Sequence, residues 1–336
     1  MKKQLDVGWW QWLAENRLMD NPAESMITAM IAQGFDRETC EGAIAQLDGH
    51  PFYKAARNHQ QLHRKLESVT SNLQALWQSS SNWGVIEKRP CPPREEFLER
   101  YVRACRPVVL TDVADDWPAL QRWTPALLRK RFADLPVEIQ LGRESDPRFE
   151  QNKDAHKRTV PFAEFIDRIV AADNSNDCYL TANNELLKRP EFASLFDDVG
   201  SLPSCCDATR LAGSSFFWVG PRGTNTPLHH DTVMLFHTQV IGRKRWRFIS
   251  PLDTPNLYNY EGVFSPVDVD APDFGRHPRF RDVNVLEVTV GPGETIFLPL
   301  VWWHQVSALD LSVSFSFTNL DLRNDYPYRN PTLRHW

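Results

Sequence analysis

Three side chains that can bind a metal ion stand out in the 336-residue sequence. The run TPLHHD places His229 and Asp231 two positions apart, and on a β-strand they share a face while His230 points away. A third ligand must come from elsewhere, and the best candidate is His304, in the run GPGETIFLPLVWWHQV. Two histidines and one carboxylate leave about three positions of an octahedral ion open, as in non-haem Fe(II) oxygenases. The HxD pair alone is a weak signal, because surface strands commonly carry a histidine and an aspartate.

A lysine is expected on an apolar strand face. The run VIGRKRWRF is typical of a hairpin turn and a returning strand, with Lys244, Trp246 and Phe248 on one face and three arginines on the other. Burial of an unpaired ammonium is costly, so a buried anion is expected beside Lys244, and the distal carboxylate of a dicarboxylic acid would serve. The alternative is that Lys244 snorkels to the rim of the barrel.

Two further polar residues fall on informative strand positions. Asn319 follows the alternating run DLSVSFSFT and takes its apolar parity, so it is either a strand-end residue or a donor to a bound ligand. His237 shares parity with His229 and Asp231, but six residues along a strand span about 20 Å. His237 is therefore rejected as a ligand of the same ion, and the remaining histidines are assigned no role.

Residues 1 to about 80 are predicted to be helical. Apolar residues recur at helical spacing near 26–31 and 43–47, and a third run, 62–77, has its apolar residues at steps of three and four. One apolar stripe per helix means that these helices pack on something. They form either a helical cap on the main domain or a module for dimerisation or for binding a peptide.

From Trp83 onward the chain changes to short β-rich runs separated by proline and glycine. A strand is expected at 107–111 and a helix at 117–132. Further strand-like segments are 214–220, 232–240, 243–250, 285–290, 294–299 and 311–318. Several short strands with turn signals and few helices between them predict a sandwich or barrel. We therefore expect a helical region at 1–82 and a β-rich domain at 83–336.

Composition excludes several classes of protein. With 42% hydrophobic and 24% charged residues and a mean hydropathy of -0.45, the chain is typical of a soluble globular protein. No apolar run reaches the ~20 residues that cross a bilayer, and polar residues interrupt any secretory signal at the start. The net charge of -5 offers no basic surplus for nucleic acid. Six cysteines without CxxC spacing predict reduced thiols in a cytoplasmic protein.

These motifs resemble those of the JmjC and cupin-like 2-oxoglutarate oxygenases, especially the small hydroxylase branch that contains the asparaginyl hydroxylase of the hypoxia response. The resemblance rests on TPLHHD, GRKRW, GPGETIFLPLVWWHQV and SFSFTN, and it covers roughly residues 83–320. It implies a mainly β fold, with a double-stranded β-helix (jelly-roll) core in a JmjC/cupin-like domain at 83–336. The α-helical N-terminal region and flanking helices would complete the chain.

The resemblance also assigns residues to the site. It implies that Fe(II) is held by the two histidines and the aspartate, with 2-oxoglutarate and O2 as co-substrates. The residues that it places around 2-oxoglutarate are Thr226, Lys244, Tyr179, Trp218 and Asn319. Thr226 and Lys244 would bind the far carboxylate, Tyr179 would be a further contact, and Trp218 would line the pocket. Lys244 and Asn319 each lie fifteen residues after a ligand histidine, which matches the hydroxylase pattern.

Three features depart from that pattern. Leu235 stands where these hydroxylases often carry an asparagine, so the polar shell of the cosubstrate is expected to be thinner or rebuilt. His230 replaces a tyrosine, with little expected consequence because it faces away. Only 17 residues follow Asn319, too few for the paired C-terminal dimer helices of the asparaginyl hydroxylase. A homodimer would therefore use the N-terminal helices.

We expect a 2-oxoglutarate-dependent dioxygenase that hydroxylates an unactivated carbon, on a peptide or protein side chain by the family resemblance, with no nucleic-acid or membrane partner. Lysine demethylation is less favoured. A second hypothesis is a cupin that serves as a metal-binding regulatory or binding protein without oxygen chemistry, in which case Lys244 has no obvious task. A third is a zinc or manganese isomerase or hydrolase, which is disfavoured because such sites usually gather more histidines.

Overall fold

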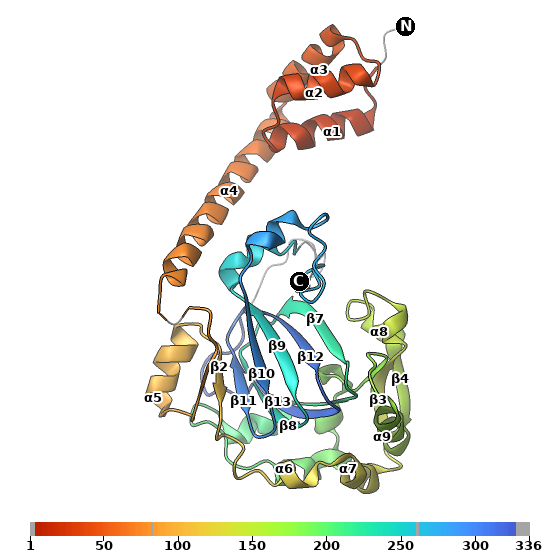
Figure 1. Cartoon of the computed structure of the whole chain (residues 1–336), viewed down its shortest axis with the longest axis vertical. Helices are drawn as coiled ribbons and strands as arrows, with labels where there is room; N and C mark the ends of the chain where they lie inside the picture. Colours follow the sequence, from red (N-terminus) through yellow and green to blue (C-terminus); the bar gives the residue numbers. More distant parts are fainter. Residues whose placement is uncertain (1–3, 82, 260–261, 327–336) are drawn as a thin grey trace. The chain divides into compact units, whose positions relative to one another are not determined.

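The computed structural model describes residues 4–81, 83–259 and 262–326. The chain divides into two compact units, Met1–Trp77 and Gln78–Trp336 (Figure 1). None of the helices in the described residues is both long enough and apolar enough to span a bilayer. The six cysteines are free thiols.

The N-terminal unit is helical, as the spacing predicts. Its helices are α1 (Val7–Leu18), α2 (Ala23–Ala32), α3 (Arg37–Gly49) and α4 (Pro51–Gln78). The side chains of Asp6 and Asp36 cap α1 and α3, because each accepts a hydrogen bond from a backbone N–H of the first turn. Pro51 begins α4, at a position where a helix does not use the N–H that proline lacks. A small core joins these helices: Leu13, Met26, Ile27, Met30, Phe35, Cys40, Ala43, Ile44, Leu47 and Tyr53.

Two sheets form the centre of the second unit, and Figure 1 shows the four-stranded sheet in front of the six-stranded one. The six-stranded sheet has the order β1-β2-β11-β8-β13-β6, in which all pairs except β1–β2 are antiparallel. Its strands are β1 (Glu87–Arg89), β2 (Val108–Leu110), β6 (Ser215–Gly220), β8 (Leu235–Ile241), β11 (Thr295–Leu298) and β13 (Ser312–Phe317). The antiparallel four-stranded sheet, β10-β9-β12-β7, contains β7 (Asn225–His230), β9 (Lys244–Ile249), β10 (Val285–Val290) and β12 (Trp303–Ala308). The strand segments expected from the sequence are confirmed.

The six-stranded sheet separates the main core from the space between the sheets. On one face, Phe315 and Phe317 pack against the fully buried indole of Trp117, Phe315 also contacts Trp123, and Phe236 stacks on Phe317. Because side chains alternate along a strand, the residues between these phenylalanines point to the other sheet. That inner face is where the candidate site lies.

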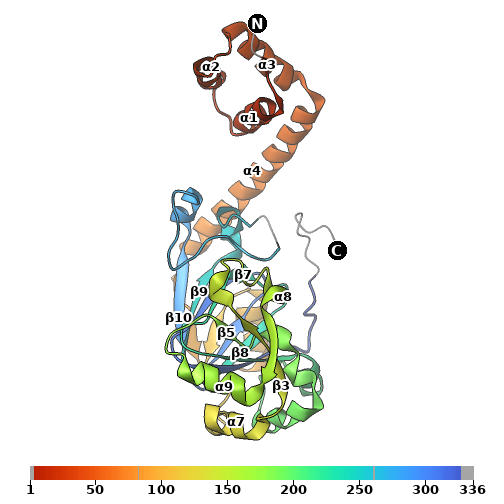
Figure 2. The ribbon, with the colours of Figure 1, turned by 90° about the vertical axis from the view of Figure 1, so that its right-hand side faces the viewer.

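A third sheet and several short helices cover the side of the unit, as Figures 1 and 2 show. The sheet, β4-β3-β5, was not expected, because β4 is polar and mostly exposed and β5 has only two residues. Its strands are β3 (Pro136–Leu141), β4 (Lys157–Pro161) and β5 (Cys178–Tyr179). The helix expected at 117–132 is divided in two, because Thr124 caps a new helix that Pro125 begins. The α-helices here are α5 (Arg94–Phe97), α6 (Ala119–Arg122), α7 (Pro125–Phe132), α8 (Lys153–His156) and α9 (Phe162–Ala171).

The expectation of a mainly β chain needs correction. The structure has 42% helix and 22% strand, so the chain is not plainly mainly β. The helical N-terminal unit and short helical turns in the long connections account for the difference. Those turns are the π-helical Leu98–Arg103 and the 3-10 segments Arg143–Ser145, Ala182–Asn184, Leu186–Lys188, Pro190–Asp198, Ala208–Gly213, Pro251–Asn256 and Pro278–Asp282.

Candidate metal centre

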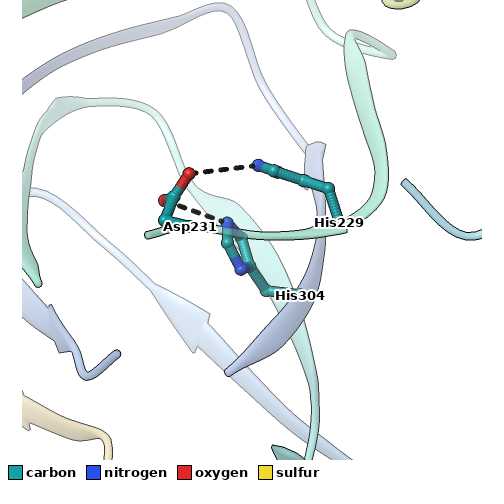
Figure 3. Close-up of side chains that lie close together, drawn as sticks. All are labelled: His229, Asp231 and His304. Carbon is teal, nitrogen blue, oxygen red and sulfur yellow. Dashed lines mark ion pairs between the residues drawn. The ribbon is translucent and has the colours of Figure 1, made fainter. Parts of the chain in front are cut away.

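Strand pairing brings the three candidate metal ligands together. His229 lies on β7, Asp231 directly follows that strand, and His304 lies opposite His229 on β12. The Nε2 atoms of His229 and His304 are 4.0 Å and 3.8 Å from the two carboxylate oxygens of Asp231 (Figure 3). One ligand atom from each residue lies within 4.8 Å of the others. The three side chains thus converge on a point that one metal ion could occupy.

Backbone contacts orient both imidazoles for metal binding. The Nδ1 atom of His229 is 2.8 Å from the carbonyl oxygen of Pro227, and Nδ1 of His304 is 2.9 Å from that of Trp302. A carbonyl oxygen only accepts, so each Nδ1 carries the proton and each Nε2 presents its lone pair toward Asp231. Burial lowers the pKa of His304 well below its ordinary value, which keeps the imidazole neutral, as a ligand must be.

Burial has the opposite effect on the carboxylate. It raises the pKa of Asp231 above the ordinary value, while His229 acts to lower it. A carboxylate held in a poorly solvated place gains from a cation nearby, so a divalent ion would favour the ionised form. The donor set of two neutral imidazoles and one carboxylate suits a first-row transition metal and leaves other coordination positions open.

The three ligands open into a cavity of about 640 Å³. Its walls come from both sheets and from β5, and they include Tyr179, Trp218, Thr226, Leu235, His237 and Lys244. Four of the five residues expected around a cosubstrate therefore share one cavity with the metal centre.

Lys244 lies deep in this cavity, at the first position of β9, and is 2% exposed. Its Nζ donates to the hydroxyl oxygen of Tyr179 at 3.3 Å and lies 3.5 Å from Nε2 of His237. Within residues 4–81, 83–259 and 262–326, no carboxylate forms an ion pair with this ammonium. Burial lowers the pKa of Lys244 to about 7. The alternative of a snorkelling lysine is wrong, because the Lys244 side chain is buried inside the cavity, where an ammonium is costly.

The other three residues on the cavity wall come from three different strands. Thr226 is half-buried on β7, and Tyr179 is 3% exposed on β5. Trp218 lies on β6, where its Nε1 donates to the hydroxyl of Ser316 at 2.8 Å. The Nζ of Lys244 is 5.8 Å from the ring centres of both Tyr179 and Trp218, so aromatic faces surround the ammonium.

Asn319 is not among the residues that line the cavity. It follows β13, and its side-chain amide donates to the carbonyl oxygen of Asp207 at 2.8 Å. The backbone N–H of Asp207 donates in return to the carbonyl of Asn319 at 2.8 Å. The structure therefore places Asn319 as a strand-end residue that anchors the 207 loop, and its contact with a cosubstrate stays a prediction.

His237 is a cavity residue to which the sequence reasoning gave no role. It is buried on β8, outside the metal cluster, with its ring 5.1 Å from that of Trp246. The comparison of its parity with that of His229 and Asp231 does not hold, because His237 lies on β8, in the other sheet from β7. It is not part of the metal cluster, and its position beside Lys244 makes it part of the polar end of the cavity.

Arg143 supports the cavity wall from behind, a role that the sequence analysis did not predict. Its side chain is fully buried, and the guanidinium lies over the rings of Phe149, at 4.3 Å, and Tyr179, at 5.0 Å. Its Nη2 donates to Glu150 and to the carbonyl of Asn225, both at 2.9 Å. Arg143 thus ties Tyr179 to the start of β7. No sequence pattern marks it, because it lies in a loop without apolar periodicity.

The fold and the site together define a β-sheet domain that brings two histidines and a carboxylate, a candidate metal-binding set, into the cavity between two sheets. The chain belongs to the cupin-like domain family, which matches residues 93–319.

Several named proteins are similar in sequence to this chain. Lysine-specific demethylase 8 of Xenopus tropicalis is 34% identical over 239 residues, which are 69% of this chain and 52% of that protein. HSPB1-associated protein 1 of Bos taurus is 30% identical over 276 residues, 75% of this chain and 56% of that protein. JmjC domain-containing protein D of Dictyostelium discoideum is 28% identical over 249 residues, 66% and 53% of the two chains. The chain spans about half the length of the curated relatives it matches.

Proposed function

We propose that this protein is an Fe(II)- and 2-oxoglutarate-dependent oxygenase of the small hydroxylase branch, with a double-stranded β-helix as its core. The observation that carries the proposal is the common cavity of the metal centre and Lys244, a buried cation without a carboxylate partner among the described residues. When bound, Fe(II) and 2-oxoglutarate would supply the oxidation chemistry with O2.

The residues of the chain would bind and orient these groups. The two Nε2 atoms and the carboxylate of Asp231 would hold the metal on one side and leave the other side open. The ammonium of Lys244, with the hydroxyls of Thr226 and Tyr179, would bind the far carboxylate of 2-oxoglutarate. The indole of Trp246 stacks on His304, with ring centres 5.7 Å apart, and would limit access of water to the metal from that side.

The proposed substrate is a peptide or protein side chain with an unactivated carbon, such as that of Asn, Asp, His or Arg. Support for this choice is the resemblance of the motifs to the small hydroxylases. Demethylation of lysine is the second candidate, because a relative that is 34% identical carries the name lysine-specific demethylase 8. The two reactions are separable, since hydroxylation adds about 16 Da to the product and demethylation removes about 14 Da.

Succinate release from the Fe(II)-loaded full chain, measured with 2-oxoglutarate and O2 across a peptide panel that includes methyl-lysine peptides, tests the function. We expect release that a matching peptide stimulates, with a mass change on that peptide. His229→Ala should abolish release, because it removes a metal ligand. His63→Ala, at an exposed histidine of α4, is the matched control and should leave release unchanged.

The binding-protein alternative has its own signature. An anaerobic titration with Fe(II) and 2-oxoglutarate should give a weak visible charge-transfer band if 2-oxoglutarate coordinates the metal. Metal binding without that band, together with no succinate release, would overturn the oxygenase proposal and favour a metal-binding cupin without oxygen chemistry.

A further inference from the structure

The long helix α4 has an apolar stripe that faces solvent. Leu62, Leu66, Val69, Leu73 and Leu76 are 58%, 56%, 43%, 48% and 70% exposed. They follow one another at steps of four, three, four and three, an average of 3.5 residues. That period is the one at which two helices pair in a left-handed coiled coil, whereas a helix that lies on a globular core follows 3.6.

The same register continues toward the start of α4. Phe52, which is 81% exposed, and the exposed Ala55 and His59 take the preceding positions of the stripe. From Phe52 to Leu76 the repeat covers more than three heptads, or about 36 Å of helix. A repeat of this length is enough for a stable seam between two helices.

The N-terminal unit does not use this stripe for its own core. Its core comes from α1, α2, α3 and Tyr53 of α4, and no stripe residue belongs to it. The two buried residues of α4, Tyr53 and Gln74, both take a heptad position other than those of the stripe. Leu62, Leu66, Val69 and Leu73 therefore stay outside the core of this unit.

The residues that flank the stripe favour a second copy of this chain as the partner. In coiled coils, charges at the flanking positions select a partner of opposite charge. Here these positions hold a single formal charge, that of Lys65, among Ala56, Asn58, His63, Thr70, Asn72 and Trp77. These positions therefore do not select an acidic or a basic helix of another protein. Two copies of α4 can pair without placing like charges beside each other. A parallel pair sets Lys65 beside Thr70 of the partner subunit.

We propose that α4 pairs with α4 of a second copy as a two-stranded coiled coil, so that this protein is a homodimer. A symmetric pair is self-complementary, because the same stripe supplies both sides of the seam. The residues of this contact belong to α4 of the N-terminal unit.

Light scattering coupled to size exclusion tests the proposal on the full chain over a concentration series. We expect the wild type at twice the monomer mass of 38.8 kDa. Leu66→Glu combined with Leu73→Glu puts two charges into the seam and should give the monomer mass. Gln61→Glu combined with Ser68→Glu adds the same charge to exposed positions outside the seam and should remain dimeric.

Further measurements distinguish loss of dimerisation from unfolding of α4. Far-UV circular dichroism should show unchanged helix content in both double variants. If Leu66→Glu with Leu73→Glu unfolds α4, Val69→Asn serves instead and should weaken dimerisation at least tenfold. A wild type of 38.8 kDa, or a folded seam variant that stays dimeric, would overturn the proposal.

Discussion

At the scale of single residues, the site is governed by how burial changes the charge of its polar groups. Lys244 and His237 lie 3.5 Å apart in the same cavity, and burial lowers the pKa of each. Near neutral pH, Lys244 can donate a hydrogen bond, and His237 is neutral and can accept it. This pair forms a polar end of the cavity, whereas Leu235, elsewhere among its lining residues, offers no hydrogen bond.

The burial of Lys244 predicts a pH-dependent cost in stability. Folded Lys244 loses its proton near pH 7, whereas the unfolded residue keeps it until about 10.4. The unfolded state therefore binds more protons between these values, so the cost is full below pH 7 and falls as the pH rises. Lys244→Met should be more stable than the metal-free wild type at pH 6. Its advantage should shrink by up to ~1.4 kcal/mol per pH unit between pH 7 and 9.

Urea unfolding of both proteins at pH 6, 7, 8 and 9 measures this difference. Lys88→Met is the matched control, because Lys88 is a partly exposed lysine that pairs with Glu294. Its difference from the wild type should stay nearly constant over this range. A Lys244→Met advantage that does not change with pH would show that the folded lysine keeps its ordinary pKa.

At the scale of elements, the turn between β8 and β9 determines where Lys244 begins its strand. Gly242 has φ of +71°, and a Cβ there would collide with the backbone carbonyl oxygen of Leu311. Only glycine can adopt this φ without strain and also leave room for the Leu311 carbonyl. Gly242→Ala should therefore destabilise the protein by roughly 2 kcal/mol or more, since a left-handed residue alone costs about 1–2 kcal/mol.

Chemical unfolding checks the turn prediction, with Gly213→Ala as control. Among the described residues other than its chain neighbours, none has an atom within 4 Å of a Cβ built on Gly213, so this change should stay within about 1 kcal/mol of the wild type. Equal stability of the two variants would mean that the turn adapts to a side chain and does not constrain β9.

At the scale of the whole molecule, two separate cores predict two unfolding events. The N-terminal unit has its own buried cluster, and the larger unit has a core of its own around Phe236, Phe315 and Trp117. Calorimetry should resolve two transitions, because each unit is stabilised by its own contacts. Mn(II) with 2-oxoglutarate should raise only the transition temperature of the larger unit. At a ligand concentration of 100 times the Kd, binding adds about 2.7 kcal/mol to the free energy of unfolding of that unit.

The calorimetric result has a direct control. His229→Ala should show the same two transitions and no shift with Mn(II) and 2-oxoglutarate. A single transition in the wild type that moves as a whole would show that the two units unfold together.

The sequence by itself determined the local parts of this protein. Period-two alternation placed His229 and Asp231 on one face and put Lys244 with Trp246, because neighbours along a strand have fixed relative directions. Helical spacing and capping residues determined the N-terminal helices in the same way. Each of these inferences depends only on residues that lie close together along the chain.

Only the tertiary structure decided how distant segments meet. The pairing of β7 with β12 sets His304 opposite His229, and the packing of one sheet on the other brings His237 of β8 to Lys244 of β9. The path after β13 brings Asn319 to the 207 loop. Such contacts depend on strand register and on the course of the connections. These are settled by the packing of the whole chain, because many alternative pairings satisfy the same local pattern.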